Sequence, residues 1–172
     1  MIRSWGSGAV AAALLLAPSL GCREDWGERP WSTLERSYGV IDPAPANSEP
    51  DQTIVIRSRS SRGAHNYQGM IKRSLGRSTI YLAVESQIDA KDAPIRIPVT
   101  AIGGCSRIKW PNGWDTAVWL PDVGVDIAFR DNDGTMLRWC EERGIEMVAR
   151  QVVRGWLASK DPADTSLADD PS

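Results

Sequence analysis

Cysteine is the residue type in this sequence with the most distinctive chemistry. The sequence has three cysteines, Cys22, Cys105 and Cys140. Neither Cys105 nor Cys140 has another cysteine, or the single histidine His65, at a spacing typical of metal ligands. In an oxidising compartment such an even pair favours a disulfide, here closing a loop of about 35 residues. A bond over that length contributes about 3 to 4 kcal/mol in the chain-entropy description. The alternative is two buried free thiols.

The first 21 residues predict that the chain is exported. Arg3 supplies one positive charge, residues 9–17 form an apolar run, and small residues precede Cys22. These are the three parts of a secretory signal peptide. The apolar run is shorter than the roughly 20 residues that a membrane-spanning helix needs. We therefore expect residues 1–21 to be a signal peptide and the remainder to reach an oxidising compartment.

The end of this segment, Leu20-Gly21-Cys22, resembles the lipobox of bacterial lipoproteins, with Ser19 at a place that is usually Leu. The resemblance implies that the Cys22 sulfur receives a diacylglycerol thioether, that the chain is cut after Gly21, and that the new amino terminus is acylated. Arg23 stands where an Asp often marks retention in the inner membrane. The resemblance thus favours an outer-membrane lipoprotein that faces the periplasm. Ordinary cleavage after Ser19 or Gly21 would instead leave a soluble secreted protein.

No group of residues typical of a catalytic site is evident. His65 has no clustered partner, and the sequence contains no nucleophile elbow, P-loop or dinucleotide-binding glycine motif. Asp131, Asp133 and Glu142 have part of the spacing of a calcium loop. A strand end followed by a helix, with Asp133 as its cap, explains the same acids more simply. We therefore expect no enzyme activity, no cofactor and no metal.

Tryptophan is unusually frequent, and Trp110, Trp114 and Trp119 surround the turn-forming pair Asn112-Gly113. An Asn-Gly pair between two apolar runs is a strong hairpin signal. If Trp110 and Trp114 are exposed at the hairpin tip, they can stack on sugars or anchor a partner. If they are buried, they are core residues and cross-strand pairs.

The charge of the chain excludes one class of partner. Without residues 1–21 the chain has 19 basic and 22 acidic residues, which gives a net charge of −3. Four of the acids lie in the last twelve residues, so the body of the chain is close to neutral. A nucleic-acid-binding protein would need a clustered basic excess. We therefore expect no nucleic-acid partner.

Composition divides the rest of the chain into three parts. Residues 22–51 contain several prolines and are expected to be a lipid-anchored spacer, with a short helix whose capping box is Ser32 and Glu35. Alternatively, Trp26 and Trp31 pin this segment onto the domain. Residues 52–159 are long enough for a single globular domain, and residues 160–172 read as a disordered acidic tail.

Seven short segments of the domain have the composition or the period-two alternation of β-strands. They are joined by short turns, which favours antiparallel pairing. Pro98 predicts an edge position or a bulge for its strand, because proline cannot donate to the ladder. The expected strands are residues 53–57, 66–72, 78–85, 95–101, 105–110, 114–120 and 125–130.

The apolar period changes to a helical one after residue 134. Residues 135–143 predict one helix or turn, and residues 145–157 predict a C-terminal amphipathic helix. The expected fold class is therefore α+β, with about seven antiparallel strands in a sheet or barrel and a C-terminal helix.

This arrangement over residues 53–157 resembles the pleckstrin-homology or GRAM-like superfold. Tyr67-Gln-Gly-Met-Ile71 and Val125-Asp-Ile-Ala-Phe129 carry the resemblance. Such folds are binding platforms for lipid headgroups or peptides, although fold alone does not fix function. The nearest candidates for a basic headgroup loop are Lys72, Arg73 and Arg77. The alternative architecture is a plain β-sandwich or open barrel.

Two functions are compatible with these patterns. The first is a non-catalytic envelope lipoprotein, attached to the membrane by its lipid, whose β domain binds an envelope protein or assists assembly. The second is a glycan- or lipid-binding module that uses the hairpin from Trp110 to Trp119.

Overall fold

The computed structural model describes residues 29–59, 64–85, 92–152 and 154. These residues form one seven-stranded antiparallel sheet in the order β4-β3-β2-β1-β7-β6-β5. Its strands are β1 (Glu49–Ser58), β2 (Ala64–Leu75), β3 (Thr79–Val84), β4 (Ile95–Pro98), β5 (Gly104–Trp110), β6 (Gly113–Leu120) and β7 (Val125–Arg130). The seven predicted strands are confirmed, except that the strand predicted over residues 95–101 ends at Pro98.

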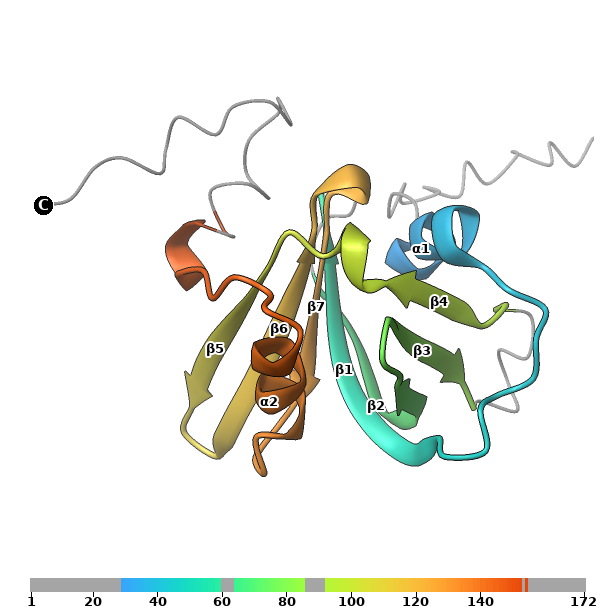
Figure 1. The fold of residues 1–172 in the computed structure, drawn as a ribbon, viewed down its shortest axis with the longest axis horizontal. Helices are drawn as coiled ribbons and strands as arrows, with labels where there is room; N and C mark the ends of the chain where they lie inside the picture. Colours follow the sequence, from blue (N-terminus) through green and yellow to red (C-terminus); the bar gives the residue numbers. More distant parts are fainter. Residues whose placement is uncertain (1–28, 60–63, 86–91, 153, 155–172) are drawn as a thin grey trace, which may run out of the picture.

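The sheet is curled rather than flat (Figure 1). It joins two halves at β1 and β7, so the outermost strands β4 and β5 lie at opposite ends. Helix α1 (Pro30–Tyr38) lies near β4, and helix α2 (Thr135–Glu142) lies in front of the β5–β6–β7 half. Short 3-10 turns, η1 (Val99–Ala101) and η2 (Pro121–Val123), follow β4 and β6. Pro98 is in the edge strand, as predicted from its missing N–H.

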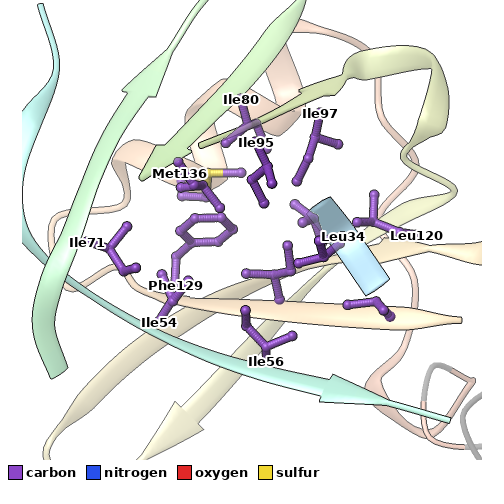
Figure 2. Packing of buried hydrophobic residues seen from close by; sticks show 14 of the residues in the cluster. Leu34, Ile54, Ile56, Ile71, Ile80, Ile95, Ile97, Leu120, Phe129 and Met136 are labelled. Atoms are coloured by element: carbon purple, nitrogen blue, oxygen red, sulfur yellow. The ribbon is translucent and has the colours of Figure 1, made fainter. Parts of the chain in front are cut away.

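The inner face of the curled sheet carries the hydrophobic core. Alternation along each strand sends Ile54 and Ile56 of β1 and Ile127 and Phe129 of β7 to this face, and all four are buried. Phe129 points into the middle of the cluster, near Met136 of α2 (Figure 2). Burying a side chain of this size contributes about 1.5 to 3 kcal/mol relative to leaving it in water.

Helix α1 packs into the core, which favours the alternative in which Trp31 pins this segment onto the domain over an extended spacer at residues 30–38. Trp31 and Leu34 are fully buried in the core, and the Trp31 indole N–H donates to Ala93 O at 3.1 Å. The Trp31 ring also packs at 5.5 Å from that of Tyr67. Of the prolines that suggested a spacer, Pro43 and Pro45 lie between α1 and β1 and Pro50 lies at the start of β1. A local pattern does not show which surface a helix will cover. Residues 22–28 lie outside the described residues.

The capping box predicted for this helix is not formed. The helix begins at Pro30, two residues before Ser32, and its first turn has no side-chain cap. Proline suits this position because its missing N–H would have no partner there. Glu35 instead accepts the Ala93 N–H at 3.3 Å and ties the helix to the segment before β4.

Helix α2 connects the two halves of the sheet. Cys140 is bonded to Cys105 of β5, which confirms the predicted disulfide, and both residues are fully buried. From the same helix the Trp139 indole N–H donates to Gly76 O, next to the β2–β3 turn, at 2.8 Å. The helix therefore holds an edge strand of one half and a turn of the other.

The amphipathic helix predicted from residue 145 is wrong for its first residues. Residues 145–149 are not helical, and Met147 forms a parallel bridge with Cys105 of β5. The Cys105 N–H donates to Glu146 O, and the Val148 N–H donates to Cys105 O. Edge-strand pairing satisfies backbone groups that a helix would have satisfied internally. Helical geometry appears only at residues 150–152 and 154, and residues 155–172, including the expected tail, lie outside the described part.

None of the helices in the described ranges is both long enough and apolar enough to cross a membrane.

Candidate functional site

The acids that suggested part of a calcium loop have structural partners. Asp131 follows β7 and is almost completely buried. Its carboxylate accepts hydrogen bonds from the backbone N–H groups of Met136 and Leu137 at 2.8 and 3.1 Å, and from Arg107 at 2.9 Å. The Thr116 hydroxyl donates to it at 2.6 Å. Asp131 therefore satisfies two backbone N–H groups at the start of α2 and links this helix to β5 and β6.

The other two acids of that pattern, Asp133 and Glu142, bind different partners from those of Asp131. Asp133 accepts the N–H and hydroxyl of Thr135, and these hydrogen bonds lower the pKa of its carboxyl below the usual 3.8. The N-cap position of α2 is occupied by Gly134 and not, as predicted, by Asp133, although Asp133 and Asp131 both accept N–H groups of the first turn. Glu142 pairs with Arg143 at 2.8 Å. No cluster of three or more metal-binding side chains occurs among the residues that the structure describes.

A second buried carboxylate lies on the outer face of the sheet, opposite the core. Asp126 of β7 is fully buried and pairs with Arg150 at 3.0 Å and with Arg57 of β1 at 3.2 Å. Burial lowers the pKa of the Arg57 guanidinium, and the Asp126 charge opposes that shift. This cluster joins residues 150–152 to the outer face.

His65 lies in β2 opposite Ile56 of β1 and is partly buried. The three basic residues considered for a headgroup loop are in or after the same strand. Arg73 pairs with Glu49, and Lys72 pairs with Glu85 at 3.3 Å. Two of the three charges are therefore already matched by carboxylates.

The predicted Asn-Gly hairpin is formed by β5 and β6, and its tryptophans face different ways. Trp110 pairs with Gly113 and Trp114 with Lys109 in adjacent rows of the ladder, so the two indoles lie on opposite faces. Trp110 is 41% exposed and Trp114 is 38% exposed, whereas Trp119 is buried. The three residues do not make one surface, and only the two at the tip can contact a ligand.

Trp114 lies on the inner face of the hairpin, and two cations lie close to its ring. The Arg107 guanidinium carbon is 5.1 Å from the ring centroid, and the Lys109 ammonium is 5.6 Å from it. A cation over an indole face is attracted by the ring quadrupole, by about 0.5 to 1 kcal/mol at exposed sites. The Trp114 backbone N–H donates to the Asn132 side chain at 2.8 Å. The indole is therefore held in place although more than a third of it is exposed.

The outer edge of β5 is only partly covered. Hydrogen-bonding positions alternate along an antiparallel strand. Because the backbone of Cys105 bonds to residues 146–148, the backbone groups of Arg107 and Lys109 also point away from β6. Within the described ranges these groups have no strand beside them. The other edge strand, β4, pairs with Gly39 at Ile95.

Trp110 lies on the outer face beside a polar pair. Its indole N–H donates to Asp115 Oδ2 at 2.9 Å, and Asp115 Oδ1 lies 3.2 Å from Arg130 Nε. Asp115 and Arg130 are direct cross-strand partners in β6 and β7. They line a hollow of about 320 Å³ together with residues from β1, β2, β7 and the hairpin turn: Thr53, Val55, Asn66, Gln68, Ala128 and Asn112.

No protein-family model, curated protein or solved structure matches this chain. The candidate binding surfaces are therefore identified from the geometry of the fold alone. Cys22, the residue predicted to carry the lipid, lies outside the described residues. The sequence pointed to Trp110 and Trp114 but not to the hollow, because the hollow's residues come from four strands.

Proposed function

We propose that this protein is a non-catalytic cell-envelope lipoprotein, anchored in the outer membrane through Cys22 and facing the periplasm, whose β domain binds a partner protein. The signal-like residues 1–21 support export. The Cys105–Cys140 disulfide supports the same compartment, because structural disulfides persist where the surroundings are oxidising.

The arrangement of the buried carboxylates supports a binding role rather than acid–base chemistry. In the described part of the chain, Asp115, Asp126 and Asp131 each pair with an arginine. A general base must lie within reach of a substrate proton. Carboxylates already occupied by guanidinium and backbone donors serve the fold instead.

The strand order supports the pleckstrin-homology or GRAM-like resemblance of the sequence. Strands β1 to β4 form one antiparallel meander and β5 to β7 form another, β1 pairs with both β2 and β7, and α2 packs on the inner face. Proteins of that superfold bind peptides or lipid headgroups. Since Glu49 and Glu85 neutralise Arg73 and Lys72, a peptide is favoured over an anionic headgroup.

The observation that carries the proposal is the open edge of β5 beside Trp114. An extended segment of a partner can add to such an edge as a further strand, using the backbone groups of Arg107 and Lys109. Tryptophan and arginine are the residue types most often found where binding energy is concentrated. No carboxylate of the described residues pairs with Lys109, so an acidic side chain in the partner segment would complement it.

A photo-cross-linking residue placed at position 114 tests this proposal in intact cells. We expect one dominant adduct with an envelope protein, identified by mass spectrometry. The same residue at Arg96, on the opposite edge strand, is the control. Equal adduct patterns at the two positions would count against a partner at the β5 edge.

Substitutions at Lys109 then test the mode of binding. Lys109→Pro removes an N–H at the open edge and leaves the β5–β6 ladder intact. We expect it to abolish binding of the segment identified by cross-linking, while Lys109→Ala weakens binding only a few-fold. If the two variants bind equally well, the partner does not add as a strand.

A further inference from the structure

The hollow on the outer face has the make-up of a ligand site that is separate from the β5 edge. Its volume of about 320 Å³ lies at the small end of the range for ligand pockets in proteins, roughly 300 to 1,000 Å³. It is lined by β1, β2, β6 and β7 and by Asn112 of the hairpin turn. Rigid strands therefore position most of its side chains.

The hollow exists because two small side chains face outward between larger ones. Val55 of β1 and Ala128 of β7 are direct cross-strand partners, and Asn66 pairs with Val55 from the other side. Asp115 and Arg130 form another row. The small side chains form a floor, and the longer polar side chains surround it.

The polar groups around this floor suit a ligand without net charge. Six of the eight lining residues have polar side chains. Asp115 and Arg130 pair with each other, so their charges cancel. In the described part of the chain the side-chain amides of Asn66 and Gln68 have no hydrogen-bond partner, and each amide can donate and accept.

Trp110 supplies a flat apolar surface at the border of the hollow. Its N–H is bonded to Asp115, which lines the hollow, and this bond fixes the ring. The Trp110 residue is 41% exposed. The face of an indole carries partial negative charge and attracts the weakly positive C–H groups of a ligand.

We propose that the outer-face hollow binds a neutral pyranose ring of a glycan, acetamido sugars included, with Trp110 under one face of the sugar. Pyranose hydroxyls donate and accept hydrogen bonds as the amides require, and the C–H face of the ring matches the indole. An anionic ligand would be repelled by the Asp115 carboxylate, and a cationic ligand would be repelled by the Arg130 guanidinium. An apolar ligand would leave the amides of Asn66 and Gln68 without partners, which is costly.

Calorimetric titration of the purified protein with oligomers of N-acetylglucosamine and with maltooligosaccharides tests this assignment. We expect saturable binding of at least one series. Trp110→Ala and the double variant Asn66→Ala/Gln68→Ala should each weaken it by about tenfold or more. Both changes are at exposed positions, so the fold should survive.

Trp114→Ala is the matched control, because this tryptophan is equally exposed but lies on the other face of the same hairpin. It should leave the sugar affinity unchanged, and inorganic phosphate should not compete. Absence of binding by both series, or equal losses for Trp110→Ala and Trp114→Ala, would overturn the site. Neither result bears on the protein partner, since that proposal rests on Lys109 and Trp114.

Discussion

Arg150 donates two hydrogen bonds of 3.0 Å, one to each carboxylate oxygen of Asp126, across 24 residues of sequence. Asp126 is fully buried on the outer face of β7. Paired bonds of this kind are stronger and more directional than neutral hydrogen bonds. They hold the residues after α2 against the face of the sheet that lies opposite the core.

We expect Arg150→Ala to lower the free energy of unfolding by about 3 kcal/mol, because a buried carboxylate would lose its main partner. Urea denaturation measures this loss. The control is Lys72→Ala, whose ion pair with Glu85 is about one-third exposed on both sides. It should cost less than about 1 kcal/mol. Equal losses for the two variants would mean that the Asp126 pair does not stabilise the fold.

Removing the Cys105–Cys140 bond should destabilise the protein by about 3 to 4 kcal/mol, because the unfolded chain regains the freedom of a 35-residue loop. The double variant Cys105→Ala/Cys140→Ala and the reduced wild-type protein should unfold at similar urea concentrations. The variant should also no longer respond to reductant. A wild-type midpoint that reductant does not change would contradict a stabilising bond.

Trp31→Ala should cost about 3 to 5 kcal/mol, as is usual for a large side chain removed from a core. The measurement is again the free energy of unfolding. Trp114→Ala, at an exposed tryptophan, is the comparison and should cost much less. If Trp31→Ala changes the free energy of unfolding only slightly, residues 30–38 act as a spacer and not as part of the core.

Burial raises the pKa of Tyr81 above its usual 10.0, although the charges of Arg96 and Lys72 oppose the shift. The folded state then keeps this proton at pH values where the unfolded state releases it. Stability should therefore be complete below about pH 10 and fall as the pH rises above that value. Urea denaturation between pH 9 and pH 11 should show a shallower fall for Tyr81→Phe than for wild type. Identical slopes would assign the alkaline loss to other groups, Tyr38 among them.

The proposed anchor predicts a lipid-modified amino terminus. Mass spectrometry of protein purified from membranes should find Cys22 as the first residue, heavier by a diacylglycerol and an acyl chain. Cys22→Ser should move the protein from the membrane fraction to the soluble periplasmic fraction. A mature chain with an unmodified Cys22 would preserve export but remove the tether.

Alternation predicts a strand best where only one face is buried, as in β1 and β4, whereas β6 and β7 are buried on both faces. Ile54 and Ile56 in β1 and Ile95 and Ile97 in β4 alternate with more exposed residues and are fully buried in the structure. The pattern was weaker in β2, where polar residues and Gly69 interrupt the alternation. At Gly69 the backbone has a φ of +63°, and the register between β1 and β2 shifts nearby.

The errors arose where long-range contacts override local patterns. Ile145 and Val148 have helical spacing, yet the disulfide at Cys140 brings the chain alongside β5, where an open edge accepts it. Similarly, prolines after α1 suggested a spacer, but Trp31 is buried in the core, as the alternative of a segment pinned onto the domain predicts.

The candidate site was predictable only in part. The Asn-Gly turn and its flanking tryptophans indicated a hairpin with aromatic residues at its tip, and Trp110 and Trp114 are exposed there. That they face opposite ways follows from the register, which the turn length sets. The hollow depends on four strands that meet only through the sheet order.

The disulfide also determines how the domain would respond to mechanical force. The bond between Cys105 and Cys140 encloses most of β5, all of β6 and β7, and most of α2, so pulling on the two ends of the chain cannot extend the residues between them. For the 35-residue separation this withholds about 120 Å of contour length. A domain stretched between a membrane anchor and a bound partner would thus lengthen only through the part of the chain outside this loop.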